Sequence, residues 1–201
     1  MKLYYSPTSP YVRKVNVFAI EASLDEEIEK IITNPWIEDA SLLTDNPLSK
    51  VPTLIMSNGT VLYDSPVICE YLDSLNPGEK LIPAAGIERW EALRLQALGD
   101  GILDAAVLRF LERKRPASQQ THDWDSMQRN TIQRALTYLD NKVREWNADV
   151  TIGQITVACA IGYLDFRFKE DNWRQGQPVL TNWFADFSER SSMQATLPKT
   201  G

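Results

Sequence analysis

The stretch KVPTLIMSNGTVLYDSP, from Lys50 to Pro66, constrains the fold more than any other part of this chain. Two β-rich runs, Thr53–Met56 and Thr60–Tyr63, lie on either side of Asn58-Gly59. Because Asn-Gly readily adopts the positive φ angles of a tight turn, this pattern is a strong hairpin signal. The stretch therefore predicts two antiparallel strands joined by a short turn.

Both ends of this hairpin carry groups that suit one kind of ligand. A cis bond between Val51 and Pro52 would turn the Val51 backbone N–H and C=O outward, where an extended peptide can pair with them. After the hairpin, Ser65 is the predicted N-cap of a helix and Pro66 takes its first position. Asp64 offers an acceptor for an ammonium group, and the helix N-terminus attracts a carboxylate. A ligand with an amino-acid head and a peptide backbone matches this set.

Length and charge narrow the functional class. A chain of 201 residues fits one large or two small domains and buries a core. Its formal net charge of −6 argues against a nucleic-acid surface. We expect no signal peptide and no membrane span, because neither apolar pattern is present. Cys69 and Cys159 lie in apolar helical contexts and are expected to be buried free thiols, which favours a reducing compartment such as the cytoplasm.

The segments around the hairpin predict an alternating order of strands and helices. The expected elements are a strand over Lys2–Tyr5, a helix over Tyr11–Ala22, a strand over Glu27–Ile32, a loop or short helix within 34–47, and a helix over Val67–Leu75. A strand, helix and strand in succession favour parallel pairing of the two strands.

From Pro83 onward the pattern is helical throughout. The predicted helices cover Ile87–Lys114, Asp123–Trp146, Thr156–Phe168 and Pro178–Arg190. Gly99 and Gly101 lie inside the first of these, where glycine is unfavourable, so they indicate close packing. The change of composition predicts a domain over residues 1–77, a linker over 78–85 and a second domain over 86–201.

The pattern Val51-Pro52, hairpin, Asp64-Ser65 at a helix start resembles the glutathione site of the cytosolic glutathione transferases. The segments SPTSPYVRKV, ALGDGILDAA and ITVACAIGYLDFR strengthen this resemblance, which covers nearly the whole chain and is nearest to bacterial transferase homologues of the YibF kind. It implies an α/β plus all-α fold, with an N-terminal thioredoxin-like domain and an all-helical C-terminal domain.

One departure from the family pattern concerns the buried helix of the second domain. In the family this helix starts with a Ser/Thr-x-x-Asp capping box. Here the corresponding residues are Thr156-Val157-Ala158-Cys159, which keep the predicted N-cap and lack its acidic partner.

Thioredoxin-like folds place their chemistry at the start of the first helix, where the helix dipole stabilises an anion. Residues 6–11 hold no cysteine, so disulfide exchange at this position is excluded. A hydroxyl there can still donate to a bound thiolate and lower the pKa of the thiol. Ser9 is the predicted catalytic group, because Ser9-Pro10-Tyr11 followed by Arg13 resembles classes that use serine, although a plain N-cap is an alternative role. The other candidate hydroxyls are those of Tyr5, Ser6, Thr8 and Tyr11.

The resemblance also implies the remaining contacts with glutathione. Lys50 corresponds to a cation for the glycyl carboxylate, with a solvated loop lysine as the alternative. Asp100 resembles an aspartate that reaches the glutamyl ammonium across the interface of a homodimer. Together with Ser9, the predicted glutathione contacts are Lys50, Val51, Pro52, Asp64, Ser65 and Asp100.

A second substrate is expected between the domains, against the first helix and the long helix that follows the linker. The candidates for this pocket are Tyr11, Leu103, Ala106, Val107, Arg109 and Phe110, whose spacing also fits a plain core. Arg13 is expected to be structural. The only histidine, His122, is expected on the surface, and the sequence predicts no metal site.

The resemblance implies a homodimeric cytoplasmic glutathione transferase, active in detoxification. Glutathione is its co-substrate, and a small hydrophobic electrophile is its second substrate. Two alternatives remain open, and fold alone does not separate them. One is a non-catalytic binding or regulatory protein on the same fold. The other is a different glutathione-dependent enzyme, such as a peroxidase, isomerase or dehalogenase.

Overall fold

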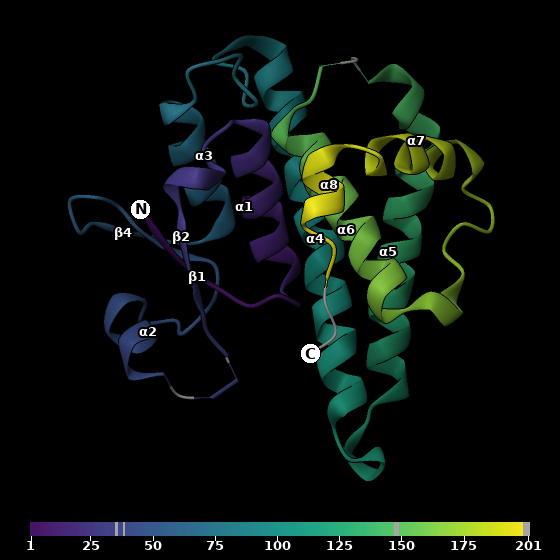
Figure 1. The fold of residues 1–201 in the computed structure, drawn as a ribbon. Coiled ribbons are helices and arrows are strands. Elements are labelled where there is room, and N and C mark those ends of the chain that lie inside the picture. Colours follow the sequence, from purple (N-terminus) through teal and green to yellow (C-terminus); the bar gives the residue numbers. More distant parts are fainter. Residues whose placement is uncertain (35, 38, 147–148, 199–201) are drawn as a thin grey trace. The chain divides into compact units, whose positions relative to one another are not determined.

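A computed structural model describes residues 1–34, 36–37, 39–146 and 149–198 of the chain (Figure 1). Contacts divide these residues into two compact units. The N-terminal unit contains Met1–Trp90 together with the C-terminal stretch that begins at Ser191, and the helical unit contains Glu91–Arg190. The division into domains over 1–77 and 86–201 stays a prediction. Within the described ranges, no helix is long and apolar enough to cross a membrane.

The N-terminal unit contains a four-stranded sheet with the order β2-β1-β3-β4 (Figure 1). The strands are β1 (Lys2–Tyr5), β2 (Glu29–Ile32), β3 (Thr53–Ile55) and β4 (Val61–Leu62). β1 is parallel to β2, as the crossover argument predicts, and antiparallel to β3. β3 and β4 form the predicted hairpin, with Gly59 at a φ of 85° in its turn.

The helices of the same unit contribute buried residues to its core. They are α1 (Pro10–Glu21), α2 (Ala40–Asp45), α3 (Ser65–Leu75) and α8 (Ser191–Ala195), with a 3-10 turn at Asp25–Glu27. α1 packs against both α3 and α8. Fully buried side chains of β1, α1, β3 and α3 form the core, among them Leu3, Phe18, Leu54 and Leu72. The helix α8 has no counterpart among the predicted elements.

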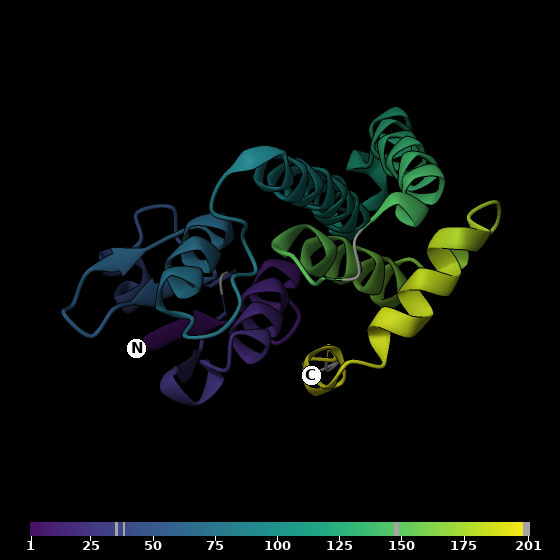
Figure 2. The ribbon, with the colours of Figure 1, turned by 90° about the horizontal axis from the view of Figure 1, so that it is seen from above.

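The long helix α4 (Gly86–Lys114) starts in the N-terminal unit and continues into the helical unit. The helical unit also contains α5 (His122–Lys142), α6 (Ile152–Arg167) and α7 (Pro178–Ser188). Its 3-10 turns are Ala117–Gln119, Val143–Glu145 and Lys169–Asp171. Every residue from Ile152 to Leu164 is buried, so α6 is the central helix of this unit, and Figure 2 shows it between α4 and α7.

Two glycines allow α4 and α6 to approach closely. A Cβ atom added at Gly99 would lie 2.8 Å from Thr156 Cγ2 and 3.0 Å from the Val157 nitrogen. A Cβ atom at Gly153 would lie 2.8 Å from the Ala92 carbonyl oxygen. Close packing is thus confirmed at Gly99, but it is wrong for Gly101: outside the backbone of its own helix turn, no atom of the described residues lies within 4 Å of an added Cβ.

The predicted start of the central helix is wrong. α6 begins at Ile152 with Thr151 as its N-cap, and the Thr151 N–H donates to Gln154 Oε1 at 2.7 Å in a capping box. Thr156 lies inside the helix, where its hydroxyl donates to the Ile152 carbonyl oxygen at 2.7 Å. Gln154 therefore fills the position that the family pattern gives to an acidic residue.

Candidate functional site

Three predicted segments of the site meet at one edge of the sheet. β1 leads into residues 6–9 and the start of α1. Tyr4 pairs with Thr53 in the antiparallel ladder, so Val51-Pro52, just before β3, lies beside the end of β1. Because β4 runs antiparallel to β3, the chain leaving β4 at Asp64-Ser65 returns to this same edge. The topology therefore brings together three segments that lie far apart in the sequence.

Ser9 is the N-cap of α1. Its backbone is extended, and its Oγ accepts a hydrogen bond from the Val12 N–H at 3.3 Å. This confirms the N-cap role that the sequence left as an alternative. A serine hydroxyl has two acceptor lone pairs and one donor proton, so capping leaves the proton available for another acceptor. A group at this place can thus cap the helix and also donate to an anion.

The other candidate hydroxyls surround Ser9 along the chain. Ser6 Oγ and Thr8 Oγ1 lie 3.5 Å apart, and both residues are half-buried, as are Tyr5 and Tyr11. Their roles stay predictions. Tyr4, which was not a candidate, is buried and donates from its hydroxyl to Asp45 Oδ2 at 2.9 Å. Burial, reinforced by the hydrogen bond to Asp45, raises the pKa of Tyr4.

The Val51-Pro52 peptide bond is cis. A network of buried side chains holds the loop in front of it. Asn46 Nδ2 donates to the Lys50 carbonyl oxygen at 3.1 Å and to Thr53 Oγ1 at 2.9 Å. Thr53 Oγ1 in turn donates to the same Lys50 carbonyl at 2.8 Å.

Sequence reasoning missed both members of this network. Asn46 is 1% exposed and Thr53 is fully buried, so each is held by contacts from all sides. A buried polar side chain without a partner is costly, which explains why their polar groups bond to each other and to the backbone. The Asn46-Pro47 pair signalled a turn, but nothing local indicated that its amide would reach Lys50.

The second predicted cap is wrong by one residue. Asp64 is the N-cap of α3, Ser65 is its first residue and Pro66 its second. Both Asp and Ser are frequent N-caps, so composition did not separate them. The Asp64 carbonyl accepts the Ile68 N–H at 3.0 Å, whereas its carboxylate makes no capping hydrogen bond and is exposed. Ser65 is buried at the start of the helix.

The remaining predicted contacts with glutathione lie apart in the chain. The Lys50 side chain is exposed in the N-terminal unit, next to the cis bond. Asp100 is half-buried on α4 in the helical unit. Arg13 is confirmed as structural, because its Nη2 donates to the Met193 carbonyl oxygen at 3.2 Å and its Nε to Thr196 Oγ1 at 3.4 Å.

The predicted second-substrate residues divide between the units. Tyr11 belongs to α1, whereas Ala106, Arg109 and Phe110 belong to the part of α4 in the helical unit. Leu103 and Ala106 are fully buried, while Val107 and Phe110 are half-buried. Phe110 thus keeps part of its ring accessible.

Arg109 is occupied by an internal ion pair. It is 1% exposed, its Nε lies 3.1 Å from Asp125 Oδ1, and its Nη1 bonds to Asp171. Its guanidinium carbon also lies 4.6 Å from the centre of the Phe168 ring. Burial opposes the charge, but the hydrogen bonds to Asp171 and Asp125 outweigh it, so the pKa of Arg109 is raised. This geometry gives Arg109 a structural role.

Two smaller expectations are confirmed. Cys69 and Cys159 are both buried, and neither is part of a disulfide. His122 is exposed as the first residue of α5. Among the side chains that the structure describes, no group of three or more His, Cys, Asp or Glu has the arrangement of a metal site.

Comparisons with known proteins agree with this geometry. The family model described as "Glutathione S-transferase, N-terminal domain" matches residues 8–75. An uncharacterized GST-like protein of Escherichia coli (strain K12), YibF, is 34% identical over 201 residues, with 98% of each chain covered. The stated resemblance to transferase homologues is therefore confirmed over the full chain.

Solved structures extend the similarity to the fold. A glutathione transferase family member from Pseudomonas fluorescens Pf-5, crystallised with bound glutathione, gives a TM-score of 0.96 at 43% identity, covering 99% of each chain. A second structure from that source, with bound S-(propanoic acid)-glutathione, gives 0.92 at 41% identity and covers both chains fully. A glutathione S-transferase from Methylobacillus flagellatus KT with glutathione bound gives 0.93 at 36% identity, covering 98% of this chain and 99% of that one. The predicted fold class, a thioredoxin-like region followed by a mostly helical remainder, is confirmed.

Proposed function

Because this chain belongs to the glutathione S-transferase family, we propose that it binds glutathione and transfers it to an electrophilic carbon of a second substrate. The observation that carries the proposal is the meeting of Ser9, Val51 and Asp64-Ser65 at one edge of the sheet. Similar proteins with bound glutathione support the identity of the thiol. A cytoplasmic homodimer that acts in detoxification belongs to the same proposal.

Each part of glutathione has a matching group in the proposed site. The cysteinyl backbone pairs with the N–H and C=O of Val51 beside the cis Pro52. The glutamyl ammonium meets the exposed Asp64 carboxylate, and the glutamyl carboxylate meets Ser65 at the N-terminus of α3. Lys50 meets the glycyl carboxylate, and in the homodimer Asp100 completes the ammonium site.

Ser9 is proposed to activate the thiol. Its hydroxyl donates a hydrogen bond to the sulfur and favours the thiolate, and the N-terminus of α1 acts in the same direction. A free thiol has a pKa of about 8.5, so a shift of one or two units, each about 1.4 kcal/mol, ionises most of it at neutral pH. The thiol proton passes to solvent.

The transfer step forms one bond between sulfur and carbon. The thiolate supplies the electron pair, and a leaving group departs with the electrons of its own bond, or a double bond shifts its electrons to a carbon that takes up a proton. A Pseudomonas fluorescens relative binds S-(propanoic acid)-glutathione, a thioether of glutathione, which supports carbon–sulfur bond formation. The second substrate is proposed to contact Phe110, whose ring is partly accessible.

Calorimetric titration with glutathione is the first test. We expect binding in the micromolar to millimolar range, weakened at least tenfold in Ser65→Ala, because a hydrogen bond to a charged group contributes about 1.5–3 kcal/mol. Val67→Ala, an exposed position of the same helix, is the matched control and should bind like the wild type. Absence of binding by the wild type would refute the proposal.

Activation by Ser9 is tested separately. Ser9→Ala should raise the pKa of the bound thiol and slow conjugation, whereas Ser6→Ala and Thr8→Val should leave both unchanged. If Ser6→Ala or Thr8→Val raises this pKa instead, that hydroxyl replaces Ser9 in the mechanism. Glutathione binding without conjugation of any electrophile in a panel would favour the non-catalytic alternative, and turnover of peroxides or haloacids would favour a different glutathione-dependent enzyme.

A further inference from the structure

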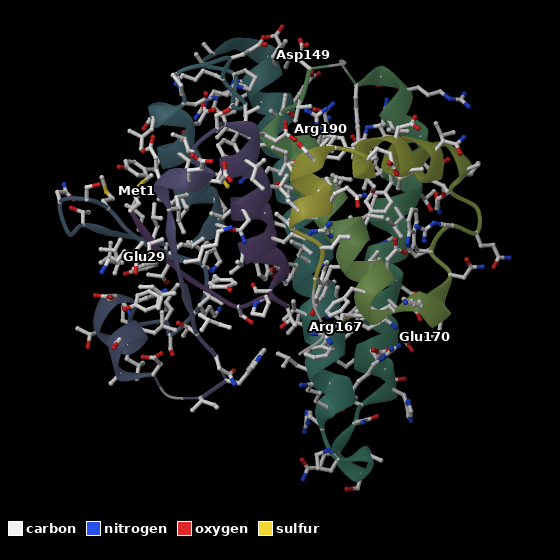
Figure 3. The ribbon with its side chains drawn as sticks, in the orientation of Figure 1. Met1, Glu29, Asp149, Arg167, Glu170 and Arg190 are labelled. Carbon is white, nitrogen blue, oxygen red and sulfur yellow. The ribbon has the colours of Figure 1, made fainter. Side chains whose placement is uncertain are left out.

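Arg167, the last residue of α6, lies in an aromatic environment (Figure 3). Its guanidinium carbon is 4.1 Å from the centre of the Phe166 ring and 4.4 Å from that of the Phe110 ring. The side chain is half-buried, and its Nε atom is buried without a hydrogen-bond partner among the described residues. The Arg167 guanidinium is therefore stacked on two aromatic rings, and its Nε–H has no hydrogen-bond acceptor among the described residues.

Two other arginines of the helical unit that stack on rings, Arg109 and Arg174, are paired with carboxylates. Arg109 stacks on Phe168 and pairs with two aspartates. Arg174 lies 4.4 Å from the Trp173 ring centre, and its Nη2 bonds to Asp165 Oδ2 at 2.8 Å. Arg167 makes no ion pair with any residue that the structure describes. A half-buried cation without a counter-charge is unusual, because charges taken out of water are normally paired.

One polar neighbour of Arg167 within the helical unit is the neutral hydroxyl of Tyr163. Burial raises the pKa of Tyr163, and the nearby charge of Arg167, which donates to its oxygen, opposes that rise. Tyr163 is 4% exposed and stays protonated at neutral pH, because its pKa lies above the ordinary value for tyrosine. The hydroxyl therefore accepts a hydrogen bond from Arg167 without neutralising it.

A second cation lies over the same ring. Lys114 Nζ, on the exposed last residue of α4, is 4.7 Å from the centre of the Phe110 ring and makes no ion pair within the described ranges. Two uncompensated positive charges thus flank Phe110 in a chain whose formal net charge is −6. The local potential favours an anion beside an apolar surface.

We propose that Arg167, assisted by Lys114, binds a carboxylate of the second substrate, whose apolar part packs against Phe110. This inference rests on the proposed transferase function and names its substrate class: small electrophiles that carry a carboxylate. The guanidinium presents parallel N–H donors that match the two oxygens of a carboxylate. A neutral electrophile has no such pair of charged oxygens and cannot form this contact. Arg167 is therefore a specificity-determining residue in this scheme.

Direct binding tests the site without any catalytic step. The wild type is titrated with 3,5-dinitrobenzoate and with the neutral 3,5-dinitrobenzamide, which has nearly the same shape. We expect the carboxylate to bind about tenfold or more tightly than the amide, as loss of a charge-assisted hydrogen bond would predict. In Arg167→Gln this preference should disappear while binding of the amide changes little. Equal binding of the two probes by the wild type, or a preference that survives in Arg167→Gln, would overturn the inference.

Two further variants keep the result interpretable. Arg174→Gln removes an arginine that also stacks on a ring but is already paired with Asp165, so it should retain the full preference. Arg167→Lys keeps the charge and loses the planar fork, so it should retain part of the preference even if Arg167→Gln is poorly folded. A preference lost equally in Arg174→Gln would point to general electrostatics and refute a specific site at Arg167.

The carboxylate could also belong to glutathione itself, and a second titration separates the two sources. Arg167→Gln should bind glutathione as the wild type does; a parallel loss of glutathione affinity would overturn the assignment to the second substrate. Conjugation of 4-chloro-3,5-dinitrobenzoate and its methyl ester then tests the link to function. If the wild type prefers the dinitrobenzoate through Arg167 but conjugates neither these compounds nor any other electrophile of the panel, the proposed transferase function fails and the anion site stands.

Discussion

The side-chain amide of Asn46 donates a hydrogen bond to the carbonyl oxygen of Lys50 at 3.1 Å, immediately before the cis Val51-Pro52 bond. This contact ties a loop residue to the backbone that the proposed site presents to glutathione. Since Asn46 is 1% exposed, its amide cannot exchange this partner for water without opening the loop. A residue that touches no ligand in our proposal thus determines where the ligand-binding backbone lies.

Replacing Asn46 by alanine should therefore affect both stability and binding. We expect Asn46→Ala to lower the free energy of unfolding by about 1–3 kcal/mol, because it leaves the buried Thr53 hydroxyl and the Lys50 carbonyl with fewer partners. Glutathione affinity should fall as well. Urea denaturation and calorimetry measure the two effects. Thr44→Ala, which removes an exposed hydroxyl of α2, is the control, and equal losses in both variants would contradict this role.

A negatively charged substitution at position 9 can separate the helix-capping role of Ser9 from its proposed role in activating the thiol. Ser9→Ala should lower the free energy of unfolding by about 1 kcal/mol, because the Val12 N–H loses its cap. Ser9→Asp keeps a good capping group but places a negative charge beside the sulfur, so stability should stay near that of the wild type while the pKa of bound glutathione rises. Ultraviolet titration of the thiolate measures the pKa. A normal thiol pKa in Ser9→Asp would argue that the sulfur is bound elsewhere.

Two glycines of α4 should respond in opposite directions. Gly99→Ala is expected to destabilise the protein by about 1–3 kcal/mol, because the new methyl group meets backbone atoms of Thr156 and Val157. Gly101→Ala should stabilise it by up to about 1 kcal/mol, because alanine favours the helix and the surrounding space is open. Thermal or urea unfolding of both variants measures the two changes in the free energy of unfolding. A stabilised Gly99→Ala variant would show that α4 and α6 are less closely packed than described.

The carboxylate of Asp73 should make stability depend on pH. Asp73 is buried and accepts the Leu81 N–H at 2.8 Å, and burial raises its pKa above the ordinary value despite the nearby Lys80 and Arg89. A raised pKa in the folded state means that folding favours the protonated carboxyl. The contribution of Asp73 to the free energy of unfolding is therefore present at low pH and is lost as pH rises through the folded-state pKa. Asp73→Asn keeps a side-chain oxygen that can accept the Leu81 hydrogen bond, but it carries no charge.

The wild type should accordingly lose stability relative to Asp73→Asn as pH rises from about 4, the ordinary pKa of aspartate, towards neutrality. Free energies of unfolding of both proteins across this range measure the difference. If the wild type instead gains relative to the variant, attraction by Lys80 and Arg89 outweighs burial.

Features with local causes were predictable from the sequence. Asn58-Gly59 specified the hairpin, and Ser9-Pro10 specified the start of α1, because turn and cap geometry depend on a few adjacent residues. The cap of α3 was placed one residue late, since Asp64 and Ser65 both suit that position. The cap of α6 was predicted at Thr156, because the family pattern has an acidic residue three positions after the cap, whereas the helix is capped by Thr151 and uses Gln154 at that position.

Features with distant causes were not predictable. The role of Asn46 depends on Lys50 and Thr53 closing over it, and the ion pairs of Arg109 come from two other segments of the chain. The five-residue helix α8 (SSMQA) has too little apolar periodicity to be recognised, and it is held by α1, almost the whole chain away. Such contacts arise from tertiary structure, for which a single sequence provides no local signal.

The bond from Arg13 to the Met193 carbonyl has a consequence for the order in which this protein is made. On the ribosome the sheet and α1 are synthesised well before α8, yet α1 packs on α8, and Met193 is 1% exposed. The N-terminal unit must therefore keep one face of α1 uncovered until α8 has been translated. A nascent chain stalled before Ser191 would carry the proposed glutathione-binding half unfinished.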